Sequence, residues 1–309
     1  MWVEGKLSRL SFVLGKGGVG KSTVAAALAV AAHREGARVL AVEIGEATGL
    51  ARALGVVLEK PLETKRSPFG VGVVRFEGSA ALAEYLTRVL HLGPLLEGVL
   101  ASPLYSAFVD AAPGLKDLMV AGKIRAELLF AHDGFRSRWD WIVVDTGASG
   151  HALELLRTPL VMADTFTAGR VRRESGGIRN LYADPQRTTV HVVATPEEMP
   201  VAEAIATVSR LRELELPLGT AIVNRCRPPV PTGTEEVLRR LAATTPSRES
   251  GDLLLAARRE LGWVRLQEDA IVRLRQGTAL PLLSLPDLPA GPEESVLTRL
   301  AGLISGALP

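Results

Sequence analysis

Short apolar runs alternate with longer amphipathic segments along most of the chain. Several runs are apolar at consecutive positions, as in Val-Leu-Ala-Val-Glu-Ile and Ile-Val-Val-Asp, which is typical of strands buried on both faces of a parallel sheet. The segments between them suit crossover helices, so the pattern predicts an α/β fold with a doubly wound, mostly parallel sheet flanked by helices. The expected strands are Leu10–Leu14, Arg38–Ile44, Val71–Phe76, Trp141–Asp145, Val190–Thr195, Gly219–Asn224 and Leu282–Leu285.

The alternation stops between residues 77 and 138, where only helical periodicity remains. We therefore expect one domain over residues 1–309 with an inserted helical subdomain at 77–138. The run LVMADTFTAG at 160–169 looks like a further strand, and residues 228–250, rich in Pro, Thr and Ser, predict an irregular surface region. The C-terminal segment from residue 293 is apolar on one side and is expected to dock on the body of the protein.

The composition narrows the class of protein. Of 309 residues, 47% are hydrophobic and 23% charged, as in a soluble globular protein, and the net charge of +2 gives no reason to expect a nucleic-acid partner. The one cysteine, Cys226, excludes an internal disulfide and a Cys-x-x-Cys zinc site. The N-terminus does not read as a secretory signal, and the longest apolar run, Val24 to Ala32, is too short to span a membrane. We expect a cytoplasmic protein without stable membrane insertion.

The strongest chemical signal is GKGGVGKST at residues 15–23, which fits the phosphate-binding pattern G-x-x-x-x-G-K-[ST]. It follows a predicted strand and precedes a predicted helix, which is the context this loop requires. Backbone N–H groups and the helix N-terminus bind phosphate, Lys21 reaches the outer phosphates and Ser22 binds Mg²⁺. ATP and Mg²⁺ are the expected cofactors, and the expected contact residues are Gly15, Lys16, Gly17, Gly18, Val19, Gly20, Lys21, Ser22 and Thr23.

The extra lysine, Lys16, makes the loop K-G-G-x-G-K-[ST], which resembles the deviant Walker ATPases, P-loop NTPases of the SIMIBI class. In that family the first lysine crosses a dimer interface and contacts the nucleotide of the other subunit. The resemblance therefore implies a catalytic role for Lys16 in a homodimer, or in a heterodimer with a paralogue, with ATP between the subunits.

Residues 139–159, WDWIVVDTGASGHALELLRTP, resemble the bacterial members of the arsenical-pump and tail-anchored-protein-targeting branch. The resemblance implies that Asp145 meets Mg²⁺ through water and that Gly147 to His151 form the second switch loop. AAPGLKDLMV at 111–120 matches a family element with Asp117 in place of Glu. The strand AIVNRC implies that Asn224 binds adenine, and the turn at 284–291 implies that Pro286 and Asp287 line the base.

The first switch loop departs from the family. Its aspartate, thought to orient the attacking water, aligns with Gly45 in the run Glu43-Ile44-Gly45-Glu46. Glycine can neither accept a proton nor align a water. Either Glu46 reaches back as a catalytic substitute, or the chain binds ATP and hydrolyses it very slowly; we favour slow hydrolysis.

Three hypotheses follow. The first is a dimeric ATPase whose nucleotide state controls an unidentified protein client. The apolar stretch 95–109 of the insert either forms a groove that binds this client or belongs to the hydrophobic core. The second is a non-catalytic regulatory subunit of a heterodimer with an active paralogue. The third is a spatial-organising ATPase of the Min or Par type. A lone cysteine argues against arsenite and zinc as ligands.

Overall fold

The computed structural model describes residues 9–45, 48–90, 102, 114–129, 138–147, 149–244, 248–289 and 293–306. Glu46 and nearly all of the apolar stretch 95–109 lie outside these residues. Within the described chain no helix is both long and apolar enough to cross a membrane.

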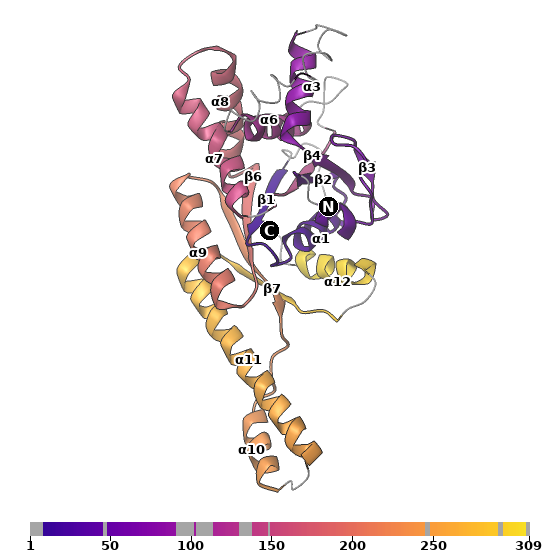
Figure 1. Ribbon diagram of the computed structural model, residues 1–309, viewed down its shortest axis with the longest axis vertical. Helices are drawn as coiled ribbons and strands as arrows, with labels where there is room; N and C mark the ends of the chain where they lie inside the picture. The colour runs from indigo at the N-terminus through magenta and orange to yellow at the C-terminus, as the bar shows by residue number, and fades with distance from the viewer. Residues whose placement is uncertain are drawn as a thin grey trace.

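The described residues form an eight-stranded sheet in the order β3-β4-β2-β5-β1-β6-β7-β8 (Figure 1). All neighbouring strands are parallel except β3 and β4, so the predicted fold class and all seven predicted strands are confirmed. The additional strand, β3, is two residues long and too short to leave a pattern. The strands are β1 Arg9–Gly15, β2 Val39–Ile44, β3 Lys65–Arg66, β4 Gly72–Phe76, β5 Trp141–Asp145, β6 Thr188–Ala194, β7 Leu218–Cys226 and β8 Leu282–Pro286.

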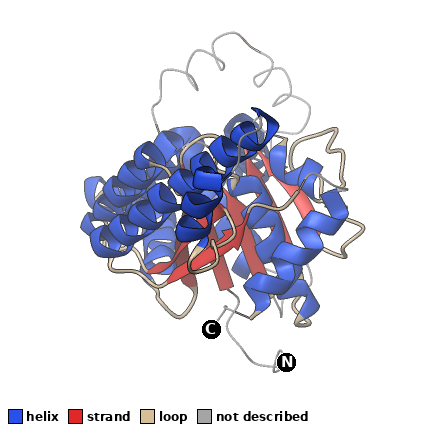
Figure 2. Cartoon of the chain, turned by 90° about the horizontal axis from the view of Figure 1, so that it is seen from below, coloured by secondary structure: helices blue, strands red, loops and turns tan. Residues whose placement is uncertain are grey.

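Helices cover both faces of the sheet (Figure 2). Side chains alternate along β1, so Leu10, Phe12 and Leu14 join one apolar core and Val13 joins the other. The first core is closed by α6, α7, α8, α9 and α11, and the second by α1, α2 and α12. The described helices are α1 Lys21–Arg34, α2 Gly49–Ala53, α3 Gly78–Leu90, α6 Leu115–Leu129, α7 Ser149–Thr165, α8 Gly169–Ala183, α9 Glu198–Glu213, α10 Thr234–Thr244, α11 Arg248–Thr278 and α12 Glu293–Ser305.

The described part of the expected insert is helical, and the C-terminal helix docks as expected. Helices α3 and α6 lie between β4 and β5 in the chain and pack against each other, while α6 also packs on α7. Helix α12 packs on α1, where the Arg34 side chain donates hydrogen bonds to the carbonyl and hydroxyl of Thr298, both at 3.2 Å. The limits of the insert at 77 and 138 remain a prediction.

The expected strand at 160–169 is wrong. Residues up to Thr165 continue helix α7, and Gly169 begins α8. Pro159 lies inside α7 without ending it. Ala152, Leu156 and Ala163, four and seven residues apart, are buried in turn, so helical periodicity prevails over the apolar run.

The expected irregular region at 228–250 is also largely wrong, because it contains α10 and the start of α11. Two acidic residues lie in the first turn of α10, and Glu236 forms ion pairs with Arg239 and Arg240, three and four residues on. Such pairs favour a helix despite the surrounding Pro and Thr. Helix α10 and the first part of α11 extend away from the sheet as a long arm, while the end of α11 packs beside α9 (Figure 1).

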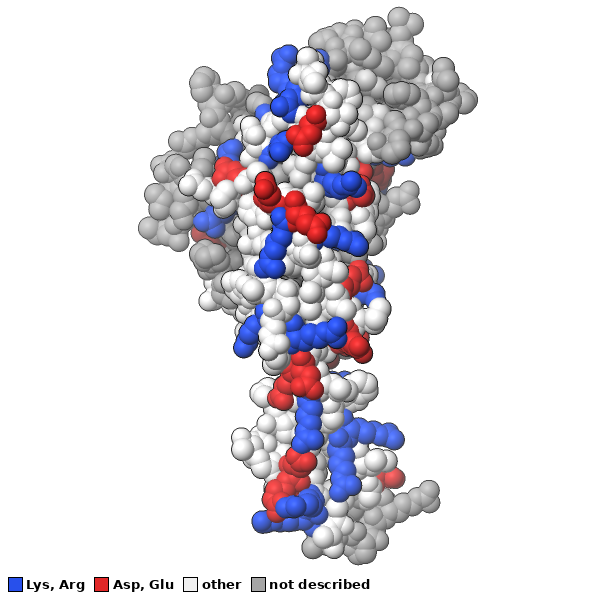
Figure 3. Space-filling model, turned by 90° about the vertical axis from the view of Figure 1, so that its left-hand side faces the viewer, with Lys and Arg blue, Asp and Glu red and all other residues white. Residues whose placement is uncertain are grey.

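Basic residues do not form a single positive surface on the face shown in Figure 3. Arginines and lysines lie beside acidic residues along the arm and the body. Examples are the pairs of Arg227 with Glu260 at 2.7 Å and of Arg265 with Glu235. This mixed pattern is typical of solvated helix faces.

Candidate nucleotide-binding site

The phosphate-binding loop lies at the carboxyl edge of the sheet, directly after β1. Strand β1 pairs with β5 on one side and with β6 on the other. Strands β2 to β5 lie on the first side of β1 and strands β6 to β8 on the second, so the direction in which strands are added reverses at β1. In open parallel sheets the crevice at such a switch point is the usual ligand site. The loop then enters α1 at Lys21, so the helix N-terminus faces the same crevice.

Lys21 is folded into the loop. Its ammonium group donates a hydrogen bond to the carbonyl of Lys16 at 2.9 Å, and the residue is buried. Burial lowers the pKa of Lys21, while the negative charges of Asp145 and Glu203 oppose that shift. The hydrogen bond thus holds the Lys21 side chain within the glycine-rich loop.

Lys16 has the opposite orientation. Its ammonium group lies 3.9 Å from the Glu203 carboxylate on α9, and its side chain is 37% exposed. The two lysines of the loop therefore occupy different environments, one buried under the loop and one at the surface beside α9.

Two buried carboxylates stand side by side next to the loop. Glu43 on β2 is directly opposite Asp145 on β5 in the strand register, and they are 1% and 2% exposed. Glu43 Oε1 accepts the backbone N–H of Leu50 at 2.7 Å, whereas Glu43 Oε2 and Asp145 Oδ1 have no hydrogen-bond partner among the described residues. Burial raises the pKa of both, that of Glu43 to about 7, and for Glu43 the neighbouring Asp145 adds to the shift.

These oxygens fit a hard cation. Ser22 faces the Asp145 carboxylate and favours its ionised form, so a hydroxyl and two carboxylates converge beside the phosphate loop. No group of three or more His, Cys, Asp and Glu is found in the described chain, so a metal would need further ligands from phosphate and water. Mg²⁺ binds in this way with nucleotides. Ser22, Asp145 and Glu43 are the residues that would hold it.

Glu43 was not among the residues expected in the site. An acid inside the otherwise apolar run of β2 is a signal in the sequence, because a carboxylate is rarely buried unless it is paired, hydrogen-bonded or bound to a metal. The sequence did not show which residue it faces, since that depends on β2 pairing with β5.

Gly45 follows β2 and donates its N–H to the Phe76 carbonyl at 2.9 Å. Its φ of +79° is in the left-handed region, and a Cβ placed on it would meet nothing within 4 Å. The first switch position therefore has room for a side chain but a backbone that favours glycine. The structure does not describe Glu46, so its proposed catalytic role stays a prediction.

The second switch segment contacts the helical insert. After Asp145, Thr146 is buried and its hydroxyl donates to the Val13 carbonyl at 3.0 Å. In the first turn of α7, His151 Nε2 lies 3.7 Å from Asp117 Oδ1 on α6. The structure thus brings together two segments that the sequence analysis singled out separately.

The predicted adenine residue, Asn224, is buried and bound to the loop. Its amide nitrogen donates to the Val19 carbonyl at 2.9 Å. Gly20 has a left-handed φ of +88°, and a Cβ there would overlap the same amide nitrogen, so only glycine allows this approach. In this arrangement Asn224 supports the loop, and the adenine contact stays a prediction.

Asn224→Ala is expected to weaken ATP binding by roughly tenfold, because a buried carbonyl that shapes the loop loses its donor. Equilibrium binding of a fluorescent ATP analogue measures this. Asn180→Ala, which removes an exposed amide on α8, serves as the control. Equal affinities for Asn224→Ala and wild type would exclude the supporting role.

A cavity of about 400 Å³ opens over the loop. Leu288 and Pro289 line it, together with Arg225, whereas the predicted Pro286 and Asp287 do not. Pro286 ends β8, and the Asp287 N–H donates to the Cys226 carbonyl at 2.7 Å. The residues that line the cavity from the loop and α1 are Gly18, Gly20, Lys21, Ser22 and Thr23.

Four features together are typical of P-loop proteins: the switch-point sheet, the glycine loop that enters a helix, the buried lysine and the strand-end aspartate. The chain belongs to the anion-transporting ATPase family, whose family model matches residues 8–174. Membership of this family favours the arsenical-pump branch over the Min or Par type.

Known relatives agree with this assignment. The chain is 33% identical to the ATPase BagA of Mycobacterium tuberculosis over 221 residues, which are 70% of this chain and 65% of that protein. It is 31% identical to a putative arsenical pump-driving ATPase of Aquifex aeolicus over 48% of this chain and 49% of that protein. It is 23% identical to the arsenical pump-driving ATPase of Escherichia coli over 77% of this chain and 42% of that protein. The chain thus spans less than two thirds of each of these relatives.

Proposed function

We propose that this chain is an ATP-dependent switch that binds Mg²⁺-ATP at the P-loop, pairs with a second subunit through the Lys16 face, and hydrolyses ATP slowly. The observation that carries the proposal is the contrast between the two loop lysines. Lys21 lies under the loop, where it can meet the phosphates of its own nucleotide, and Lys16 lies at the surface beside Glu203.

Lys16 is suited to act across an interface. An exposed ion pair contributes little to stability. Lys16 can therefore exchange its contact with Glu203 for a contact with a phosphate of the nucleotide that a second subunit binds. A cation brought in this way neutralises charge that develops during phosphoryl transfer. The second subunit is either another copy or a paralogue.

Slow hydrolysis is inferred from Gly45. In phosphoryl transfer the protein mainly positions the nucleophile and stabilises charge, and glycine supplies neither function at this position. The same observation favours a second candidate, a regulatory subunit that binds ATP and supplies Lys16 to an active paralogue carrying the missing aspartate.

Control of a protein client is inferred from the contact between His151 and Asp117. A change in the segment that follows Asp145 would be felt at α6, and therefore in the helical insert. The client itself, and whether the protein works in the cytoplasm, stay predictions.

The first test concerns Lys16→Ala. We expect this variant to bind Mg²⁺-ATP almost as tightly as wild type but to lose ATP-dependent association, because Lys16 is not the lysine that lies under the loop. Binding titrations and sedimentation with a non-hydrolysable ATP analogue measure the two properties in one sample, and Arg210→Ala, which removes an exposed arginine on α9, controls for loss of charge. If wild type stays monomeric alone but assembles with a paralogue, the regulatory-subunit function is selected; nucleotide-dependent dimers of Lys16→Ala would refute the role of Lys16.

A further inference from the structure

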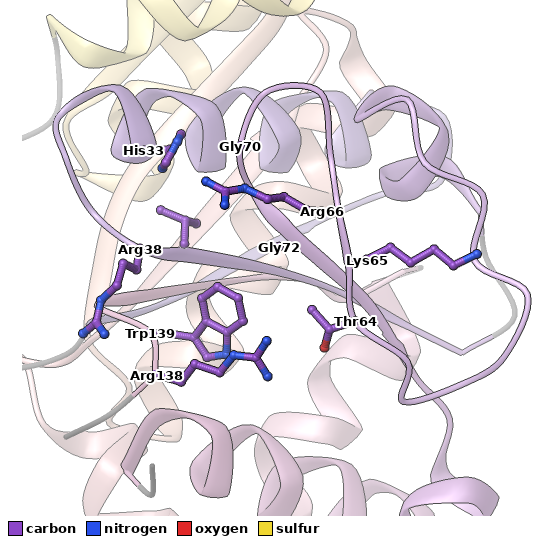
Figure 4. A pocket seen from close by; sticks show the side chains of 10 residues that line it. His33, Arg38, Thr64, Lys65, Arg66, Gly70, Gly72, Arg138 and Trp139 are labelled. Atoms are coloured by element: carbon purple, nitrogen blue, oxygen red, sulfur yellow. The ribbon is translucent and has the colours of Figure 1, made fainter. Parts of the chain in front are cut away.

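A second cavity, of about 380 Å³, lies at the opposite edge of the sheet from the P-loop. It is lined by residues that precede β2, β4 and β5 or begin them, whereas the P-loop follows the end of β1. Among the residues that the structure describes, the two cavities share no lining residue. The side chains that matter below are His33, Arg38, Arg66, Arg138 and Trp139 (Figure 4).

The short strand β3 shapes this cavity. Arg66 of β3 is directly opposite Gly72 of β4 in the antiparallel register. A Cβ at Gly72 would lie only 2.5 Å from Cη2 of Trp139, so the missing side chain makes room for the indole ring. Trp139 in turn donates its Nε1–H to Glu127 at 3.4 Å, which fixes the ring as a wall of the cavity.

The described lining residues carry positive charge, and none of them is a carboxylate. Arg38 is neutralised by Asp140, which accepts hydrogen bonds from its guanidinium at 2.7 and 2.9 Å. Arg66 and Arg138 have no ion-pair partner among the described residues, and Arg138 lies 5.0 Å from the Trp139 ring centroid. The cavity therefore keeps two guanidinium groups whose charge no described acid offsets.

His33 adds a further polar group. Its Nδ1 lies 2.9 Å from the Ala37 carbonyl, and because a carbonyl only accepts, Nδ1 must carry the hydrogen. Nε2 lies close to Gly70, where the Cβ of any other residue would overlap it. Glycine therefore leaves space for the His33 ring, which lines the cavity. Lys65 extends away from the other side chains in Figure 4 and pairs with Glu59 at 3.3 Å.

We propose that this cavity binds a phosphomonoester, with the phosphate dianion held by Arg66 and Arg138. Guanidinium groups present paired N–H donors that match phosphate oxygens. Here two of them line a cavity whose described lining residues include no competing carboxylate. The volume exceeds that of a phosphate group and leaves space for a small organic remainder beside Trp139. The site is separate from the P-loop and does not depend on the proposed switch function.

The test is calorimetric titration of the whole chain with glycerol 3-phosphate, in the presence of saturating Mg²⁺-ADP to occupy the P-loop. Vesicles containing phosphatidic acid form a second arm, because a lipid headgroup carries the same phosphomonoester. Arg66→Glu and Arg138→Glu are each expected to weaken binding by roughly 10- to 100-fold, since each removes a charge-assisted contact. Lys65→Ala and Arg210→Ala are expected to bind as wild type does.

Each outcome decides the proposal. Binding of the soluble ligand, or of the vesicles alone, that is lost in both arginine variants supports the site and identifies its source. Absence of binding in both arms overturns it, as does binding that both variants retain or that Lys21→Ala abolishes. Unchanged Mg²⁺-ADP affinity shows that the variants are folded, and Arg66→Gln replaces any variant that is not.

Discussion

Gly45→Asp is expected to raise the ATP turnover of the purified chain by roughly 100-fold, because a carboxylate at this position can orient and deprotonate the attacking water. There is room for it, since a Cβ at Gly45 meets no atom within 4 Å. The left-handed backbone opposes the change by about 1–2 kcal/mol, which is small compared with the expected gain.

Turnover and nucleotide affinity should be measured together, so that a gain in rate is not confused with a gain in binding. Gly45→Asn is the matched control, because asparagine has nearly the same shape and tolerates the same backbone but cannot take a proton. Brisk turnover by wild type, with no gain in Gly45→Asp, would show that another group positions the water. Glu46→Ala then tests the residue that the sequence suggested for this role.

The second large effect concerns Glu43. Its pKa is about 7 in the fold against an ordinary value of 4.5, so the folded state favours the protonated form. The resulting stabilisation is complete below pH 4.5 and is lost as the pH rises through about 7. Wild type should therefore lose about 3 kcal/mol of stability over this range relative to Glu43→Gln, which cannot titrate.

Urea unfolding of both proteins at pH 5 and pH 8 measures this difference, with Glu213→Gln, an exposed glutamate on α9, as control. Mg²⁺-ATP should reduce the difference at pH 8 if a cation compensates the buried charges of Glu43 and Asp145. If the stabilities of wild type and Glu43→Gln depended on pH in the same way, the fold would not raise the pKa of Glu43.

The sequence contained most of what decides the sheet and the phosphate loop. Buried parallel strands are apolar on both faces and glycine loops have fixed spacing, so both leave local patterns. The composition of residues 228–250 resembles a loop and does not predict α10, which ion pairs between neighbouring turns stabilise. The run at 160–169 was misread because its burial follows the period of α7.

The features that the sequence does not predict are contacts between segments that lie far apart in the chain. The pairing of Glu43 with Asp145 follows from strand order, and that of His151 with Asp117 from the packing of α7 on α6. The second cavity likewise joins α1, the β3–β4 hairpin and the approach to β5. No local pattern in the sequence predicts which of these residues are neighbours in the fold.

The bond between the Lys21 ammonium and the Lys16 carbonyl has a thermodynamic consequence. An ammonium group has three N–H donors, and this bond uses one of them, so two remain for the phosphates of a nucleotide. The same bond holds the side chain of Lys21 in one position, so less side-chain conformational entropy is lost when the lysine contacts a phosphate.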